Sequence, residues 1–349
     1  RGTKDDQAGA FPGSRSDAGL AFQHHALNPL EADALLVDEA SMLGLGVGHA
    51  LLEALPPTCQ LVLVGDEDQL PSVGPGGLFG ALLATRAAPV VDLRQVFRQA
   101  ARSRIVAGAL AVREGLTPQF ENVEWTPDGG LSAAHAPASG SLFPADAVLV
   151  RVPSPALVPL ALGDVVQSLC FDPGAPFAPD DVQVLAPQRV GPSGTRELNA
   201  LLQQLFHARQ ASAGGETGEE APFSFALHPS SANSSKGVAR AWQAGDRVLQ
   251  TVNCYEKNVF NGDQGRIARV SHGDAGLALE VAFPHLEAQP LEGGGVDGGL
   301  RTYVGASLQE LEWAYAITVH KAQGSEFPAI VLVLNPQHRH MLDRRLLYT

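Results

Sequence analysis

LLVDEAS at residues 35–41 and LVLVGDEDQLP at residues 61–71 are two short apolar runs, and each ends abruptly in carboxylates. A buried parallel strand has this appearance where it delivers acidic side chains to the carboxyl edge of an α/β sheet. That edge is where sheets of this kind bind ligands. The two stretches therefore predict neighbouring parallel strands that end at a functional site.

Asp38 and Glu39 directly follow the first run, and two adjacent carboxylates can divide the work of hydrolysis. Asp38 can hold Mg²⁺ through water, while Glu39 orients and deprotonates an attacking water. Metal and base are the minimum equipment for cutting a phosphoanhydride. The alternative is that both residues only cap a helix that begins near Ser41. Gln69 after the second run could sense a phosphate, which favours the catalytic interpretation.

The composition is that of a globular protein with room for two or three domains, since 45% of the 349 residues are hydrophobic. We find neither an apolar run of about 18 residues nor a signal peptide, and expect a cytoplasmic protein. Cys59, Cys170 and Cys254 are scattered, without the spacing of a zinc site or a disulfide framework. They are expected to be reduced thiols.

The net charge of −13 argues against a protein that coats nucleic acid by bulk electrostatics, so any contact with DNA must be local. Arg94, Arg98 and Arg102 share one helical face by their spacing. A second basic cluster lies at residues 339–345. Ordinary solvated helix faces are the alternative for both clusters.

The remaining pattern predicts further elements on both sides of these motifs. Helices are expected at residues 47–54, 78–84, 93–114, 157–169 and 195–207. Strands are expected at residues 147–152, 182–186, 245–250, 259–267, 277–283 and 313–319, with a buried strand at 330–334. Residues 116–144 are expected to form a loop because they are rich in Pro, Gly, Ala and Ser, and residues 208–240 an exposed connection.

From Gly245 onward, short strands alternate with Asn-Gly and Gly-Asp turns, which predicts a small antiparallel barrel inserted into the second α/β unit. An ordinary β-meander without a binding role is the alternative. The stretch AYAITVHKAQGSEF at residues 314–327 follows this region. Strand, polar turn and strand in this order bring its polar side chains to a sheet edge, where function is more frequent than packing.

Taken together, these strings resemble the RecD family of superfamily 1 DNA helicases, most closely its free-standing branch. DEAS at residues 38–41 resembles helicase motif II, and GDEDQLPSV at 65–73 resembles motif III. The other similar strings are VFRQ at 96–99 (motif IV), LAPQRVGP at 185–192, residues 245–265 (an SH3-like insertion), 314–327 (motif V) and LLYT at 346–349 (the start of motif VI).

The fold that this resemblance implies is α/β, with two RecA-like P-loop NTPase parallel-sheet domains, the first truncated, and a small SH3-like β-barrel insertion. Residues 1–90 would belong to the first domain, with part of a strand-separating hairpin subdomain at 10–30. The second domain would comprise residues 91–244 and 313–349, and the insertion would be residues 245–312.

The resemblance also implies two cofactors, ATP and Mg²⁺, and a role for each site residue. The catalytic group would be Asp38 as the Mg²⁺ ligand, Glu39 as the base that activates water, Gln69 as the coupler of nucleotide state to DNA, and Arg98 as an arginine finger. Gln69, Arg98, Gly324 and Glu326 would contact the nucleotide. Pro71, Ser72, Thr318, His320 and Lys321 would contact DNA.

The implied function is that of an ATP-dependent DNA helicase that moves 5′ to 3′ on single strands in DNA repair or recombination. Its partners would be single-stranded DNA and duplex DNA with a 5′ single-stranded tail, without a membrane, and the protein would act as a monomer. No Gly-x-x-x-x-Gly-Lys-Ser/Thr loop precedes Asp38, so the 349 residues alone should not hydrolyse ATP.

Two alternatives compete with this interpretation. One is the helicase part of a conjugative relaxase, which a flanking metal site of clustered His residues and a catalytic Tyr would favour. The other is a non-catalytic module that binds nucleic acid or protein through the insertion. The presence of Asp38, Glu39, Gln69 and Arg98 argues against the second alternative.

Overall fold

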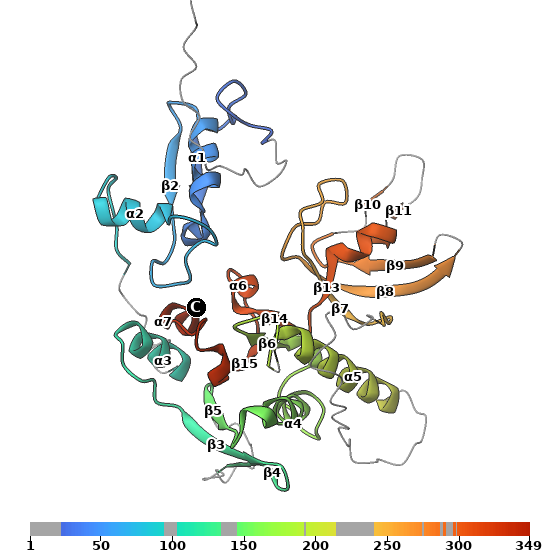
Figure 1. Ribbon diagram of the computed structural model, residues 1–349. Coiled ribbons are helices and arrows are strands. Elements are labelled where there is room, and N and C mark those ends of the chain that lie inside the picture. Colours follow the sequence, from blue (N-terminus) through green and yellow to red (C-terminus); the bar gives the residue numbers. More distant parts are fainter. Residues whose placement is uncertain are drawn as a thin grey trace, which may run out of the picture. The chain divides into compact units, whose positions relative to one another are not determined.

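The computed structural model describes residues 22–93, 103–133, 145–191, 193–213, 241–273, 276–286, 289–290, 296–297 and 299–349. The chain divides into two compact units, Arg1–Leu93 and Arg94–Thr349 (Figure 1). The helices are α1 Leu45–Ala54, α2 Leu78–Thr85, α3 Arg104–Arg113, α4 Val158–Cys170, α5 Thr195–Ala213, α6 Val319–Ala322 and α7 Arg344–Tyr348. The strands are β1 Ala34–Val37, β2 Gln60–Leu63, β3 Glu121–Thr126, β4 Gly130–Ala133, β5 Val148–Arg151, β6 Val182–Ala186, β7 Arg247–Gln250, β8 Gln264–Gly273, β9 Gly276–Ala282, β10 Gln289–Pro290, β11 Val296–Asp297, β12 Leu300–Val304, β13 Leu311–Trp313, β14 Ala316–Thr318 and β15 Ala329–Leu332.

The first unit contains the predicted pair of parallel strands. β1 and β2 pair in parallel, with Leu36 opposite Val62, and α1 forms the crossover between them. Both helices predicted in this unit are present, each within two residues of the predicted bounds. The two carboxylate-bearing stretches therefore leave the sheet at one edge, as parallel pairing requires.

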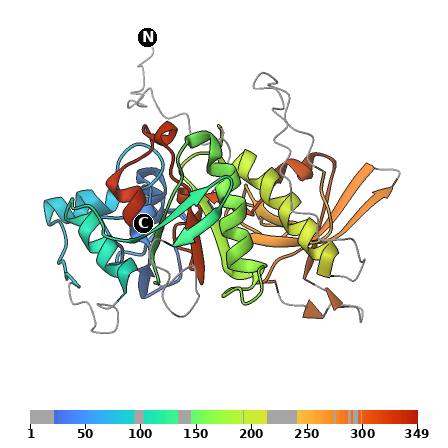
Figure 2. The same cartoon turned by 90° about the horizontal axis from the view of Figure 1, so that it is seen from below.

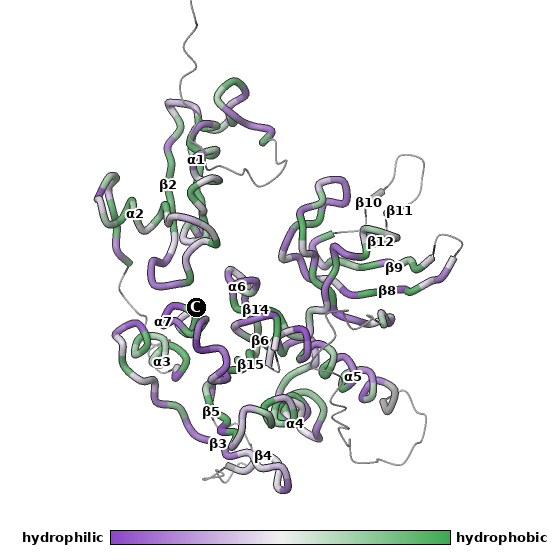
Figure 3. Tube along the Cα trace, in the orientation of Figure 1, coloured by the Kyte–Doolittle hydropathy of each residue, from purple (hydrophilic) through white to green (hydrophobic). Residues whose placement is uncertain are grey.

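One face of this strand pair is exposed, so the prediction that both strands are buried is wrong. β2 is hydrophobic along most of its length (Figure 3), yet Leu36 and Val62 are 65% and 49% exposed. Side chains alternate between the two faces of a strand, and the helices among residues 22–93 leave the face of Leu36 and Val62 uncovered.

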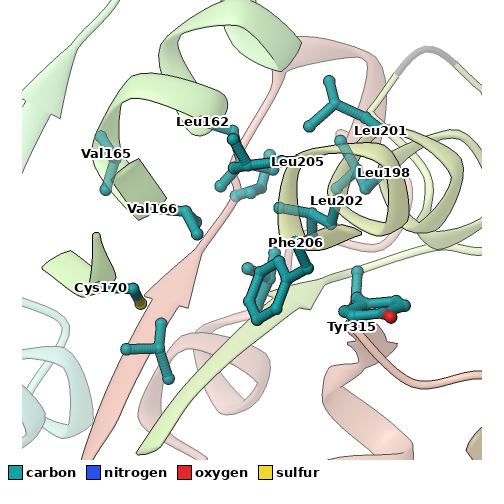
Figure 4. Packing of buried hydrophobic residues seen from close by; sticks show 14 of the residues in the cluster. Leu162, Val165, Val166, Cys170, Leu198, Leu201, Leu202, Leu205, Phe206 and Tyr315 are labelled. Carbon is teal, nitrogen blue, oxygen red and sulfur yellow. The ribbon is translucent and has the colours of Figure 1, made fainter. Parts of the chain in front are cut away.

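The main core of the second unit lies against a three-stranded parallel sheet in the order β14-β6-β15. β6 is central and buried along its whole length. Helices α4 and α5 pack against it through Val166, Leu202 and Phe206, with Tyr315 beside them (Figure 4). Asn199 of α5 exchanges two hydrogen bonds with the backbone of Ala316 in β14, at 2.7 and 2.8 Å, which fixes this helix on the sheet.

Residues 116–144 are not a simple loop, because they contain β3 and β4. β3 pairs in antiparallel fashion with β4 and in parallel with β5. Val123 and Trp125 alternate inward and are 1% and 2% exposed, and the Trp125 indole donates to Asp164 at 2.7 Å. The abundant Pro, Gly, Ala and Ser concealed this two-residue alternation. Residues 134–144 lie outside the described residues.

The predicted insertion forms a five-stranded antiparallel sheet in the order β12-β9-β8-β7-β13. Its separate core contains Leu279, Val281 and Tyr303. Figures 1 and 2 both show the β8–β9 hairpin projecting from the rest of the second unit. The mixed α/β fold, with parallel sheets and an inserted antiparallel sheet, is thus confirmed.

A buried carboxylate joins the insertion to the parallel sheet. Asp246, immediately before β7, is fully buried, and its carboxylate takes part in five hydrogen bonds. The donor groups are the side chains of Gln203 and His207 on α5, the backbone of Gln243, and the side chains of Trp313 and Tyr315. The entry and exit strands of the insertion are therefore held against α5 at one point.

Three further predictions need correction in their bounds. The helix predicted at 195–207 continues to Ala213, so residues 208–213 are not part of a connection. Of the helix predicted at 93–114, the described part is α3, and residues 94–102 lie outside the described residues. The strand near 330–334 is not buried throughout, because Ile330 is 52% exposed where β15 borders solvent.

Candidate functional site

Backbone hydrogen bonds hold the ends of β1 and β2 together beyond the paired strands. Val64 donates to the carbonyl oxygen of Val37 at 2.8 Å, and Ala40 donates to that of Val64 at 2.8 Å. Asp38 and Glu39 lie between these two bonds on the first segment. The carboxylates predicted from the sequence are therefore fixed at the carboxyl edge of the sheet, where ligands bind in α/β folds.

Glu39 has an unusual backbone conformation for its residue type. Its φ of 51° and ψ of 38° lie in the left-handed region, which costs a residue with a Cβ about 1–2 kcal/mol. Its Oε2 is buried and has no hydrogen-bond partner. A buried carboxylate oxygen without a donor is costly in a folded protein, and such costs concentrate at functional sites.

The helix-cap alternative does not hold for this pair. A short 3-10 helix follows at Ala40–Met42, but the Glu39 side chain makes no cap hydrogen bond to it. Asp38 is exposed. Within the described residues, the one hydrogen bond to its Oδ1 comes from the neighbouring Glu39 N–H, at 2.8 Å. The two adjacent carboxylates thus differ in their surroundings: Asp38 faces solvent, and one carboxylate oxygen of Glu39 is buried.

The same edge carries further acidic residues, because Asp66, Glu67 and Asp68 follow β2. Phosphate groups would be repelled here unless a cation lay between them and the carboxylates. No group of three His, Cys, Asp or Glu side chains in the described ranges could hold a metal by itself. Mg²⁺ nevertheless fits Asp38, since this ion commonly takes one or two carboxylates and completes its shell with water and phosphate.

Gly65 allows the second strand end to approach the first closely. A Cβ at this position would lie 3.0 Å from the backbone nitrogen of Ser41 and 3.2 Å from that of Ala40. Asp66 then forms a tight turn by accepting the Asp68 N–H at 3.0 Å, and Gln69 donates its N–H to the Asp66 carbonyl at 3.3 Å. Gln69 therefore stands, half-buried, at the same edge as Asp38 and Glu39.

Pro71 and Ser72 belong to the loop that follows this turn. Pro71 is exposed, and the Ser72 hydroxyl donates to the Gly76 carbonyl at 3.3 Å. Gly74 and Gly76 both have positive φ values, of 126° and 80°, so the loop folds back on itself before α2. Its tip at Val73 is 86% exposed and open to a ligand.

A second edge lies in the second unit, where β6 and β14 end side by side. Thr318 is the last residue of β14, and its hydroxyl caps α6 by accepting the Lys321 N–H at 3.4 Å. His320 and Lys321 are half-buried on this single helical turn. Gly324, with φ of 78°, ends the turn, and Glu326 beyond it is exposed.

Lys321 is paired with an acidic residue that the sequence analysis did not single out. Its Nζ lies 3.6 Å from Oε2 of Glu312 on β13, and the guanidinium of Arg189 forms an ion pair with Oε1 of the same carboxylate. Burial lowers the pKa of the Lys321 ammonium, an effect that Glu312 opposes. The sequence signal for Arg189 was its place in the string at residues 185–192, which resembles the RecD family. Glu312 had no such signal.

The predicted site residues thus form two groups, one in each unit. Asp38, Glu39 and Gln69 share the first edge with the Pro71–Ser72 loop, while Thr318, His320 and Lys321 share the second with the turn at Gly324 and Glu326. Arg98 lies outside the described residues. None of the described helices is long and apolar enough to span a membrane.

Comparison with protein families identifies three segments. The family described as "AAA domain" matches residues 14–134, and the "ATP-dependent RecD-like DNA helicase SH3 domain" matches 224–283. The "UvrD-like helicase C-terminal domain" matches 313–349. An AAA-type segment, an SH3-type segment and a UvrD-like segment follow one another in this order, and the last two matching models describe helicase domains. More particularly, the chain is RecD-like, because it matches RecD proteins along nearly its whole length.

Those relatives are longer proteins. The chain is 34% identical over 333 residues to the ATP-dependent RecD2 DNA helicase of Deinococcus radiodurans, covering 94% of this chain and 36% of that protein. It is 28% identical over 350 residues to the RecBCD enzyme subunit RecD of Mycolicibacterium smegmatis, covering 97% and 51%. The chain thus spans about a third to a half of their length.

Solved structures give a weaker likeness. A Pif1 helicase from Bacteroides in complex with ADP-AlF3 and single-stranded DNA aligns at 15% identity and a TM-score of 0.42, covering 89% of this chain and 66% of that one.

Proposed function

We propose that this chain is the motor core of an ATP-dependent DNA helicase that moves 5′ to 3′ along single-stranded DNA in repair or recombination. The observation that carries the proposal is Glu39, a residue in a left-handed conformation with a buried, unpartnered carboxylate oxygen, directly beside an exposed Asp38. The RecD-like sequence supports the same activity, since both relatives named above are RecD proteins.

In this proposal the first edge binds the phosphates of ATP with Mg²⁺ and activates water. Asp38 is the ligand of Mg²⁺, which supplies charge neutralisation when bound. Glu39 accepts the proton of the attacking water. Because its carboxylate is partly shielded from solvent, its interaction with that water is strengthened. Gln69 reports the state of the phosphates to the exposed loop that follows it. Arg98 adds positive charge for the transition state, and Gly324 with Glu326 contacts the nucleoside part.

Single-stranded DNA is contacted at a few positions rather than by a broad basic surface. Pro71 and Ser72 lie on the exposed loop of the first unit, and Thr318, His320 and Lys321 lie at the edge of the second. The chain carries 37 acidic against 24 Lys and Arg residues, so most of its surface repels phosphate. A shallow salt dependence of DNA binding follows, because each neutralised phosphate adds about 0.7 to the slope for single strands.

The test is duplex unwinding by a protein that carries these 349 residues with a phosphate-binding loop before Asp38 and a complete motif VI. Two substrates of identical duplex are compared, one with a 5′ single-stranded tail and one with a 3′ tail. ATP-dependent unwinding of the 5′-tailed substrate only is the expected result. Unwinding of the 3′-tailed substrate overturns the polarity, and unwinding of neither overturns the helicase function.

A further inference from the structure

Glu312 is shared by two cations that come from different elements of the second unit. Arg189 follows β6, and Lys321 lies on α6 directly after β14. Because β6 and β14 are adjacent parallel strands, their carboxyl ends meet at one edge, and Figure 1 shows α6 at that edge. Glu312 reaches the edge from β13, the strand by which the chain returns from the insertion.

The strength of these contacts suits an exchangeable partner. Arg189 is 55% exposed, whereas Glu312 and Lys321 are 22% and 23% exposed. The Lys321–Glu312 separation of 3.6 Å is that of an ion pair rather than a short hydrogen bond. Only the Arg189 end of the group is well exposed to solvent, and exposed ion pairs stabilise a protein by only about 0–1 kcal/mol, so an incoming anion can compete with the carboxylate there.

The group of Arg189, Glu312 and Lys321 by itself carries one more positive than negative charge. A single carboxylate with one oxygen toward each cation has the same arrangement of acceptors as a phosphodiester with two free oxygens. The guanidinium of Arg189 is suited to either anion, since its donors match carboxylate and phosphate oxygens equally.

We propose that Glu312 is an internal counter-ion that occupies a phosphate subsite formed by Arg189 and Lys321. A backbone phosphate of single-stranded DNA displaces Glu312 and takes over both cations. This inference rests on the proposed function. It adds Arg189 as a further residue that binds a DNA phosphate, and Glu312 as a residue that competes with DNA for the two cations. Glu312 lies on β13, the strand by which the chain returns from the insertion. Its displacement therefore couples DNA binding at this edge to β13.

The test measures binding of a fluorescein-labelled oligo(dT) single strand to the 349-residue chain by anisotropy, at about 50 mM and 200 mM salt. Glu312→Gln removes the competing charge and should tighten binding about two- to tenfold at the lower salt, the range that loss of a weak ion pair allows. Arg189→Gln, at an exposed position, should weaken binding. Combining the two substitutions should abolish the gain.

Glu310→Gln is the matched control. It changes the net charge by the same amount as Glu312→Gln, at a position two residues away. Glu310, however, pairs with Lys257 of the insertion, at 3.5 Å, and not with Arg189 or Lys321. This variant should bind within about twofold of the wild-type chain, as expected for a charge away from the contact. Melting curves of all variants verify that they are folded.

The outcomes separate the two proposals. If the wild-type chain binds oligo(dT) but Glu312→Gln binds no more tightly than Glu310→Gln, the counter-ion inference is overturned while DNA binding stands. Weaker binding by Glu312→Gln also overturns it, because Glu312 would then position the cations for DNA. If no form binds, the proposed function itself fails, and the inference with it.

Discussion

Ala40 donates its backbone N–H to the carbonyl oxygen of Val64 at 2.8 Å, beyond the last paired residues of β1 and β2. This bond joins the turn that carries Asp38 and Glu39 to the turn that leads to Gln69. Since no side chain is needed for it, the two motifs stay together through backbone geometry, and their side chains remain available for a ligand.

Replacement of Gly65 by Ala tests this close approach. The new Cβ would lie 3.0 Å from the nitrogen of Ser41, and backbone atoms cannot move aside as a flexible side chain can. We expect a loss of about 1–3 kcal/mol of stability, the usual cost of overpacking, measured as a lower thermal midpoint. Gly80→Ala in α2 is the control, because its Cβ meets no atom within 4 Å. Equal stability of the two variants would contradict the account.

Asp246→Asn should destabilise the second unit strongly. The carboxylate is fully buried among donors from α5, the backbone before β7 and the side chains of Trp313 and Tyr315, and an amide would present its own N–H groups to them. Disruption of such a buried charged network costs about 3–5 kcal/mol. Urea unfolding followed by tryptophan fluorescence is a direct readout, since Trp313 contacts Asp246. The exposed turn variant Asp128→Asn should stay within about 0.5 kcal/mol of wild type, and a similar result for Asp246→Asn would refute the role of the carboxylate.

Cys170 should resist modification while the protein is folded. Burial raises the pKa of its thiol to about 11 from an ordinary value of 9.0. At pH 8 a disulfide-exchange reagent should therefore modify the half-buried Cys59 and Cys254 and leave Cys170 intact until the protein unfolds.

The same pKa shift predicts a pH dependence of stability. Between about pH 9 and 11 the thiol is protonated in the folded chain and ionised in the unfolded chain, so this contribution to stability is lost as pH rises through that window. Comparison of wild type with Cys170→Ser at pH 8 and pH 10.5 isolates the effect. A wild-type chain that loses no more stability than the variant would argue against a buried thiol.

The 349-residue chain alone should bind nucleotide weakly. It contains no Gly-x-x-x-x-Gly-Lys-Ser/Thr loop, so Asp38 and Glu39 lack the backbone cradle and the lysine that hold the phosphates in P-loop NTPases. Isothermal titration with ATP and Mg²⁺ should therefore show no micromolar binding. A micromolar dissociation constant would mean that residues described above suffice for the nucleotide site.

The parallel strand pair, the helices beside it and the central strand β6 could be predicted from the sequence because their apolar residues are continuous or regularly spaced. β3 and β4 could not, since only Val123 and Trp125 reveal the alternation within a stretch of turn-forming residues. In this stretch the turn-forming composition outweighed the signal from these two residues.

The positions of Asp38, Glu39 and Gln69 at one edge also followed from the sequence, but their environment did not. A left-handed φ is unusual for glutamate, so no residue type marked the conformation of Glu39. The Asp246 network joins residues that are up to 112 positions apart, from Gln203 to Tyr315, and Glu312 meets Arg189 across 123 positions. Contacts over such distances depend on the assembled sheets rather than on local pattern.

Hydrolysis of ATP with and without single-stranded DNA is the most direct test of the proposed helicase activity. The protein to use carries these 349 residues with a phosphate-binding loop before Asp38 and a complete motif VI, as wild type and as Glu39→Gln. We expect strong stimulation by DNA in the wild type, and a loss of about 10²-fold or more in the variant with nucleotide binding retained, because only the base is removed. Absence of stimulation in a folded wild-type protein, or normal turnover by Glu39→Gln, would contradict the account.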